Sequence, residues 1–200
     1  MMNVEPFISD NHLDLGCGDK PKNPYGAYHV YGLDIRKHDN TKCVTFITAD
    51  LSLEKIPFDA DFFSSVSAFD FIEHIPRVLC DPDKRRTIFP FIELMNEIHR
   101  ILIPGGRFYA VTPLYPAEEA FKDPTHVNII TASTHSYFCG EDPMGAIYGF
   151  KGRFKLLSVA KGVPRNFFNP RRPSWFARLS SLRRWMTNDI THIKWELEKC

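Results

Sequence analysis

The chain has 200 residues, of which 44% are apolar, and a formal net charge of +1. This length and composition suit one globular domain with a sizeable core. No stretch approaches the ~20 apolar residues that a membrane-spanning helix needs. The five cysteines are scattered, without the spacing of a metal site or an even disulfide set. We expect a single cytoplasmic domain over residues 1–200 with free thiols.

Charge is distributed unevenly along the chain. Residues 161–200 contain nine Lys or Arg and three acids, a balance of +6, so residues 1–160 carry −5. This asymmetry indicates an acidic partner or substrate near the C-terminal region, with a solvated basic face as the alternative.

The first expected strand, residues 12–15, runs directly into a Gly-x-Gly turn, because residues 12–18 read His-Leu-Asp-Leu-Gly-Cys-Gly. A second strand at 30–34 ends in Asp34. In a doubly wound sheet, ligands bind outside the carboxyl ends of the strands. Glycine lets the backbone approach a ligand closely, and an acid can accept both hydroxyls of a ribose. The two segments together predict a pocket for a nucleoside-containing cofactor.

The connection between these strands argues against a dinucleotide. A dinucleotide fingerprint needs a third glycine, whereas the run from Gly16 continues Cys-Gly-Asp-Lys-Pro, and Asp19 would repel a pyrophosphate. Two prolines and a further glycine also break the segment 16–29 too strongly for a full helix.

The turn resembles motif I of the class I S-adenosylmethionine-dependent methyltransferases, of the E/D-x-G-x-G type. Later segments resemble that family's motifs in the same order: 49–51 after a strand at 44–48, 57–66 leading into a strand at 64–69, 69–75 after it, and 102–108. The resemblance covers about residues 12–160 and implies S-adenosyl-L-methionine as the cofactor. The residues that it places at the cofactor are Asp14, Gly16, Cys17, Gly18, Asp34, Ile35, Asp50, Leu51, Phe69 and Asp70.

The later elements complete the expected sheet. Apolar residues at three- and four-residue spacing predict a helix over 83–103, followed by a strand at 107–112, a loop at 113–130 and a short helix at 131–138 capped by Thr131. Strands at 154–159 and 191–198 come last, the second returning antiparallel beside the first. Residues 162–190 are then an insertion between them. We predict an α/β fold: a Rossmann-like seven-stranded sheet, mostly parallel with an antiparallel last strand, and helices on both faces.

Two histidines are candidates for the catalytic base, because methyl transfer to a hydroxyl needs a positioned group that takes the proton. His74 follows the strand at 64–69, and His126 lies in an Asp-Pro-Thr-His segment. That segment resembles one in methyltransferases that act on sugars and cell-surface glycans. Imidazole titrates near neutral pH, so we predict His126 and His74 as catalytic residues, with Asp123 orienting His126. The alternative is that both histidines only hold their loops.

A metal site is the alternative for the same region. Asp70, Glu73 and His74 with His126 resemble the E-x-x-E-H plus histidine set of magnesium-dependent methyltransferases, which include small-RNA 2′-hydroxyl enzymes and ubiquinone-pathway O-methyltransferases. Such ligands can hold a divalent cation that lowers the pKa of a hydroxyl. Because Asp70 replaces a longer glutamate, we expect no metal and keep this set as the alternative.

The insertion carries Arg171, Arg172 and Trp175. Arginine suits phosphate or carboxylate recognition, and tryptophan suits sugar rings. We expect the insertion to cover the site and bind the acceptor, with peripheral membrane contact through 170–187 as an alternative.

The sequence therefore predicts an S-adenosylmethionine-dependent methyltransferase that O-methylates a saccharide or a glycan-linked hydroxyl on a small-molecule or glycan acceptor, expected to be anionic. One alternative is a metal-dependent RNA 2′-O-methyltransferase, although nucleic acid is the less favoured acceptor. The other is a non-catalytic cofactor-binding subunit of a larger assembly. Nothing in the sequence indicates an oligomeric state.

Overall fold

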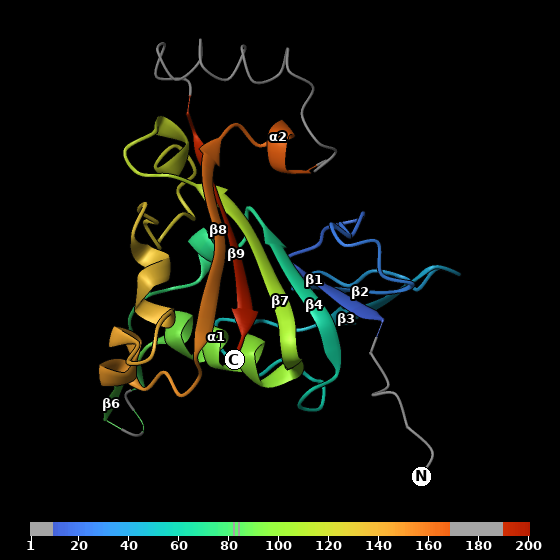
Figure 1. Cartoon of the computed structure of the whole chain (residues 1–200), viewed down its shortest axis with the longest axis horizontal. Helices are drawn as coiled ribbons and strands as arrows, with labels where there is room; N and C mark the ends of the chain where they lie inside the picture. The colour runs from blue at the N-terminus through green and yellow to red at the C-terminus, as the bar shows by residue number, and fades with distance from the viewer. Residues whose placement is uncertain (1–9, 82, 84, 169–189) are drawn as a thin grey trace.

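A seven-stranded sheet is the centre of the molecule (Figure 1). The computed structural model describes residues 10–81, 83, 85–168 and 190–200. The strands of the sheet are β1 (Asn11–Leu15), β2 (His29–Asp34), β3 (Val44–Thr48), β4 (Phe63–Phe69), β7 (Leu102–Pro113), β8 (Phe154–Gly162) and β9 (His192–Lys199). The other elements are the hairpin β5 (Leu79–Asp81) and β6 (Arg86–Ile88), the α-helices α1 (Pro90–Ile101) and α2 (Arg165–Phe168), and the 3₁₀ helices η1 (Ile72–His74), η2 (Glu118–Ala120), η3 (Thr134–Phe138) and η4 (Met144–Tyr148).

The strand order is β3-β2-β1-β4-β7-β9-β8. The first five strands of this order pair in parallel, and β9 pairs antiparallel with both β7 and β8. The predicted fold class is confirmed, including the antiparallel last strand. Because β1, β2, β4 and β7 are parallel, their carboxyl ends meet at one edge of the sheet, where ligands of such folds bind.

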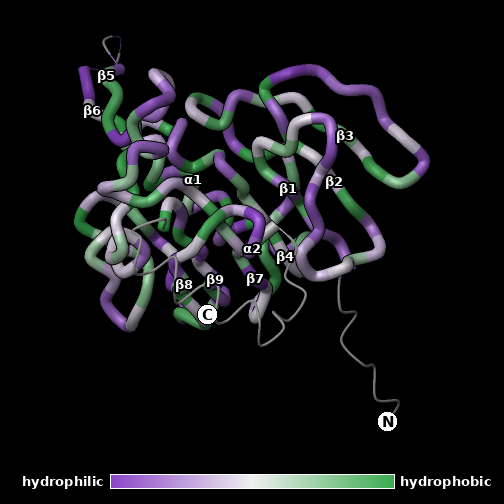
Figure 2. Tube along the Cα trace, turned by 90° about the horizontal axis from the view of Figure 1, so that it is seen from above, coloured by the Kyte–Doolittle hydropathy of each residue, from purple (hydrophilic) through white to green (hydrophobic). Residues whose placement is uncertain are grey.

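One face of the sheet holds the main core. Alternate residues of β7 and β9, such as Phe108 and Trp195, are fully buried there, and α1 packs its apolar stripe of Leu94, Met95 and Ile98 against the same cluster. Viewed from above, α1 and the β5–β6 hairpin lie on one side of β7 and β9 (Figure 2).

The opposite face is covered differently. Phe69 of β4 and Tyr109 of β7 form a smaller apolar cluster with Phe167 of α2, and Tyr25 packs against it. The Tyr109 hydroxyl donates to the carbonyl oxygen of Phe167 at 3.3 Å. The short α2 and the connection 16–28 therefore stand on this face, and the described part of that connection contains no helix. This confirms the expectation that the segment 16–29 is too broken for a full helix.

The predicted helix over 83–103 was wrong at its start. Residues 79–88 form the β5–β6 hairpin, and α1 begins at Pro90. Proline is favoured in the first helical turn because its missing N–H would have no partner there, whereas it would break a helix running through it. The predicted Thr131 cap was also wrong: η3 follows Ser133, and the Thr131 hydroxyl pairs with that of Thr134 at 3.0 Å. No helix among the described residues has both the length and the apolar character to cross a membrane.

Candidate active site

The glycine turn after β1 contains two residues in the left-handed region, Gly16 (φ +62°) and Gly18 (φ +56°). A Cβ on Gly16 would lie 2.4 Å from Cδ2 of Phe71, so this glycine is required by protein packing. A Cβ on Gly18 would meet only the Arg36 side chain, at 3.6 Å. Gly18 is therefore the position at which a ligand can approach the backbone closely.

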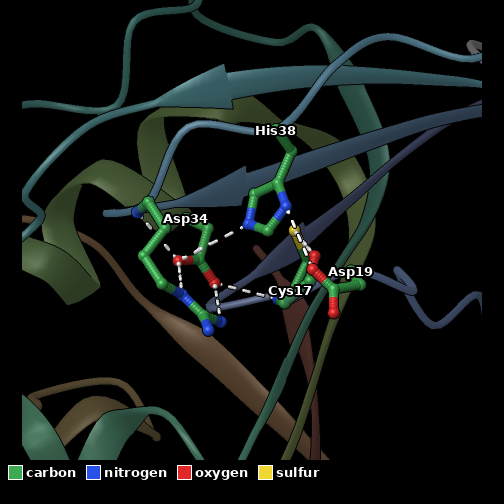
Figure 3. Close-up of polar contacts among 6 residues, drawn as sticks. Cys17, Asp19, Asp34 and His38 are labelled. Atoms are coloured by element: carbon green, nitrogen blue, oxygen red, sulfur yellow. Dashed lines mark hydrogen bonds and ion pairs between the residues drawn. The ribbon is translucent and has the colours of Figure 1, made fainter.

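Asp34 lies at the carboxyl end of β2, beside this turn (Figure 3). Its carboxylate accepts hydrogen bonds from the Gly18 N–H at 2.9 Å and from the Arg36 N–H at 2.9 Å and Nε at 3.1 Å. Burial alone would raise the pKa of Asp34, but the hydrogen bonds and charge of Arg36 hold it below its usual value. His38 lies 3.9 Å from Asp34 and 3.3 Å from Asp19. Asp34 is thus a fixed anionic acceptor of the kind that ribose hydroxyls would need. In this structure the Arg36 side chain is hydrogen-bonded to it.

Other residues that the resemblance places at the cofactor lie around this turn with different exposures. Ile35 is 65% exposed, so its side chain is free to pack on a ligand. Asp50 accepts the Ser52 N–H and holds the turn after β3. Cys17, Leu51 and Phe69 are buried, and burial raises the pKa of the Cys17 thiol to about 12.

Asp14 does not reach the sheet edge with its side chain. The carboxylate is 1% exposed and accepts hydrogen bonds from Ser67 Oγ at 2.6 Å and the Lys22 N–H at 2.8 Å. Burial raises the pKa of Asp14 to about 7. His12 approaches the Lys22 carbonyl at 3.0 Å, so both side chains hold the connection 16–28 onto the sheet. A cofactor contact by Asp14 stays a prediction.

Three predicted residues come together in one cluster. One ligand atom each of Glu73, His74 and His126 lie within 4.8 Å of one another, and the two imidazole rings make an edge contact at 4.7 Å. Backbone pairing explains the meeting, because the Val127 and Asn128 N–H groups both donate to the Glu73 carbonyl. The loop after β7 is thereby fastened to η1, which follows β4.

Asp123 supports both imidazoles. It accepts a hydrogen bond from Thr125 Oγ1 at 2.7 Å, and the same hydroxyl lies 2.9 Å from His74 Nδ1. Its other oxygen lies 3.9 Å from His126 Nε2. The structure therefore brings Asp123, His74 and His126 together, and Thr125 is a link that sequence reasoning missed.

Glu73 is the buried member of this cluster. Its Oε2 accepts from Thr112 Oγ1 at 2.9 Å, while its Oε1 and His126 Nδ1 are buried with no hydrogen-bond partner in the described part of the chain. Burial raises the pKa of Glu73 to about 8. Burial, followed by the neighbouring His126, lowers the pKa of His74. Both shifts favour the uncharged forms at neutral pH.

Asp70 is separate from this cluster, contrary to the predicted four-residue metal set. Its carboxylate lies 3.1 Å from Nε2 of His192, the first residue of β9. Sequence reasoning missed His192, because its alternation with Ile193 on the last strand equally fits an ordinary polar face. Arg171, Arg172 and Trp175 of the predicted insertion lie outside the described residues.

This site corresponds to a known domain family. A model of the methyltransferase domain matches residues 13–110, which span β1 to β7 and include the glycine turn, Asp34 and the Glu73-His74 pair. The chain therefore contains an S-adenosylmethionine-dependent methyltransferase domain, and its fold is that of the class I enzymes. The fit of the cofactor to this methyltransferase rests on the open side of Gly18 and the preset Asp34 carboxylate.

Solved structures share the fold at low identity. A Mesorhizobium loti S-adenosylmethionine-dependent methyltransferase is 16% identical with a TM-score of 0.56, over 97% of this chain and 93% of that chain. The complex between the Haloferax volcanii Trm112 methyltransferase activator and a methyltransferase is 17% identical with a TM-score of 0.58, over 95% of this chain and 82% of that chain. Geranyl diphosphate C-methyltransferase from Streptomyces coelicolor, solved with Mg²⁺, is 13% identical with a TM-score of 0.54, over 96% of this chain and 71% of that chain. No curated protein matches the chain.

Proposed function

We propose that this methyltransferase O-methylates a saccharide or glycan-linked hydroxyl and that His126 is the base. The observation that carries the proposal is the meeting of His126, His74 and Glu73 within 4.8 Å, on loops that follow the carboxyl ends of β4 and β7. S-adenosylmethionine, when bound, supplies a methyl group on a positively charged sulfur. The chain must then orient the acceptor and take its proton.

His126 is the group best placed to accept that proton. Its Nδ1 atom has no hydrogen-bond partner among the described residues, and Asp123 lies beyond hydrogen-bond distance from Nε2, at 3.9 Å. The imidazole is therefore available to take a proton from an acceptor that reaches it. The imidazolium formed afterwards would lie beside the Asp123 carboxylate, which stabilises it. His74 is held by Thr125, and in this proposal its ring packs against His126 and fixes the orientation of that imidazole.

The acceptor class rests on the resemblance of the Asp-Pro-Thr-His segment and on the basic C-terminal region. The test is a panel of acceptors, neutral and acidic saccharides, short RNA and hydroxylated small molecules, assayed for release of S-adenosylhomocysteine. Turnover of a saccharide, lost in His126→Ala, supports the proposal. Turnover of RNA alone would favour the 2′-O-methyltransferase alternative, and wild-type turnover by His126→Ala would remove the base from His126.

A divalent cation is the second candidate for the same cluster. Donor atoms within 4.8 Å of one another fit around one ion with ligand distances of about 2.0–2.4 Å. Glu73 Oε1 and His126 Nδ1 are buried atoms without a hydrogen-bond partner among the described residues, and both could be ligands of a cation. Glu73, His74 and His126 would hold it, and it would lower the pKa of a bound hydroxyl.

Calorimetric titration with Mg²⁺ and Mn²⁺ tests the cation independently of turnover. Binding that disappears in Glu73→Gln and activity that falls on chelation would support the metal site. The metal candidate fails if neither cation binds and chelation leaves turnover unchanged, and the His126 base then stands alone.

A further inference from the structure

We propose that Asp70, positioned by His192, raises the affinity of this enzyme for the charged cofactor S-adenosylmethionine relative to its affinity for the neutral-sulfur product. The two molecules differ in one feature, because the product has lost both the methyl group and the positive charge on sulfur. Their ribose, adenine, ammonium and carboxylate are shared. A fixed carboxylate near the sulfur therefore changes the ratio of the two affinities, whereas contacts to the shared groups change both affinities alike.

The backbone holds Asp70 in an unusual conformation immediately after β4. Its φ is +50°, in the left-handed region that non-glycine residues rarely adopt. The Asp70 N–H donates to the Val111 carbonyl at 2.8 Å, which ties the residue to the end of β7. Strain of this kind persists only where the surroundings enforce it, and it concentrates at functional sites.

His192 fixes the carboxylate itself. The imidazole is 7% exposed, and its Nε2 lies 3.1 Å from Asp70 Oδ1. Its Nδ1 lies 2.8 Å from Thr191 Oγ1. An imidazole that donates from Nε2 to Asp70 and contacts the Thr191 hydroxyl through Nδ1 satisfies both ring nitrogens. The chain of contacts Thr191–His192–Asp70 thus holds the carboxylate in one position.

The pair lies where it can act on the cofactor and is tied to the predicted insertion. Asp70 is 42% exposed in its side chain, so its second oxygen is open to a ligand at the carboxyl edge of β4. Thr191 donates its N–H to the Gly162 carbonyl at 3.2 Å and accepts from the Leu114 N–H at 2.9 Å. The base of the insertion, between Gly162 and Thr191, therefore meets the site through His192.

The neighbouring charges leave Asp70 as the main anion of this segment. Glu73 is buried and its Oε2 accepts from Thr112, and Asp123 accepts from Thr125. The Lys22 ammonium lies 5.0 Å from the ring centroid of Phe69, the residue before Asp70. Unit charges about 6 Å apart at a protein surface attract enough to change a binding constant about three- to tenfold.

The experiment measures the dissociation constants of S-adenosylmethionine and S-adenosylhomocysteine by calorimetry in wild type and variants, without any acceptor. In Asp70→Asn we expect the preference for S-adenosylmethionine to fall about three- to tenfold, with product affinity nearly unchanged. Asparagine tolerates the left-handed conformation, so the backbone is retained. An unchanged ratio in Asp70→Asn, or an equal loss for both ligands, would overturn the proposal.

His192 is tested by a conservative and a non-conservative variant. His192→Gln keeps an N–H donor for Asp70 and should retain most of the preference, whereas His192→Leu should lose part of it. If His192→Leu fails to fold, Thr191→Val is the disruptive variant in its place, because it removes the hydroxyl that contacts the His192 ring. Equal ratios in His192→Gln and the disruptive variant would show that His192 does not position Asp70.

Asp61→Asn is the matched control. Asp61 is also left-handed (φ +55°) and pairs with a cation of β9, Lys199, at 2.7 Å, but it precedes β4 and so belongs to the opposite edge of the sheet. In Asp61→Asn the ratio of the S-adenosylmethionine and S-adenosylhomocysteine dissociation constants should equal that of wild type. A ratio lowered as far as in Asp70→Asn would show that general surface charge, and not the Asp70 position, sets the preference. The proposal rests on the cofactor alone, so the acceptor screen can fail without affecting it.

Discussion

Gly16 and Gly18 have the same left-handed backbone but different surroundings, and this predicts different effects of the same substitution. In Gly16→Ala the new Cβ would lie 2.4 Å from Phe71 Cδ2. A left-handed alanine costs about 1–2 kcal/mol, and forcing a methyl group into packed surroundings costs about 1–3 kcal/mol more. Gly16→Ala should therefore destabilise the protein by about 2–5 kcal/mol. Gly18→Ala should cost only the backbone strain of about 1–2 kcal/mol, because its Cβ meets a flexible Arg36 end at 3.6 Å.

Urea unfolding of both variants measures the difference, and calorimetry measures their affinity for S-adenosylmethionine. We expect Gly18→Ala to keep most of its stability and to bind the cofactor more weakly, since the methyl group occupies the open side of the turn. For Gly16→Ala we expect the free energy of unfolding to fall more than the affinity for S-adenosylmethionine. Equal destabilisation of the two variants would refute the role of Phe71, and unchanged cofactor affinity in Gly18→Ala would refute the assignment of that side to the ligand.

Three further predictions concern the acids and the base. Asp34→Ala should weaken S-adenosylmethionine binding by about 2–4 kcal/mol, because hydrogen bonds to a charged acceptor are lost, and unchanged affinity by calorimetry would contradict the β2 assignment. His126→Ala should lower turnover about 10²–10⁴-fold with cofactor affinity near wild type, which acceptor-dependent release of S-adenosylhomocysteine measures. Burial raises the pKa values of Asp14 from 3.8 to about 7 and of Glu73 from 4.5 to about 8, so the folded state binds protons more tightly than the unfolded state. Stability should fall as pH rises from about 4 to about 8, and Asp14→Asn and Glu73→Gln should each flatten that dependence in urea unfolding; parallel curves for wild type and variants would contradict the shifts.

The sheet was predictable because its information is local. Alternation of apolar and polar residues fixes which side of a strand is buried, and the parallel order followed from motifs met in sequence. The start of α1 was misplaced because the apolar spacing that predicts the helix begins only at Ile88, and the residues before it pair as a hairpin. Pro82 and Pro90 are the residues that argue against a helix running through this segment.

The candidate site was predictable where one segment carries it and unpredictable where distant segments meet. Asp34 and the glycine turn are adjacent through β1–β2 pairing, so their meeting followed from the fold class. The contact of Glu73 with His126 depends on two backbone hydrogen bonds across loops, and only the family resemblance indicated it. The contact of Asp70 with His192 joins the ends of β4 and β9, and no local pattern marks it.

The acid of motif I shows how an altered neighbourhood changes a residue's task. A helix after β1 would cover that face of the sheet with apolar side chains, but the connection 16–28 is too broken to form one. His12, Asp14 and Ser67 instead make a buried hydrogen-bonded network that accepts the Lys22 N–H and approaches its carbonyl. Burying a carboxylate is costly unless it is hydrogen-bonded, and Asp14 has one donor from β4, the Ser67 hydroxyl, and one from the connection, the Lys22 N–H. The acid and the connection thus stabilise each other, and that mutual support sets the position of the Gly18 backbone on which cofactor binding depends.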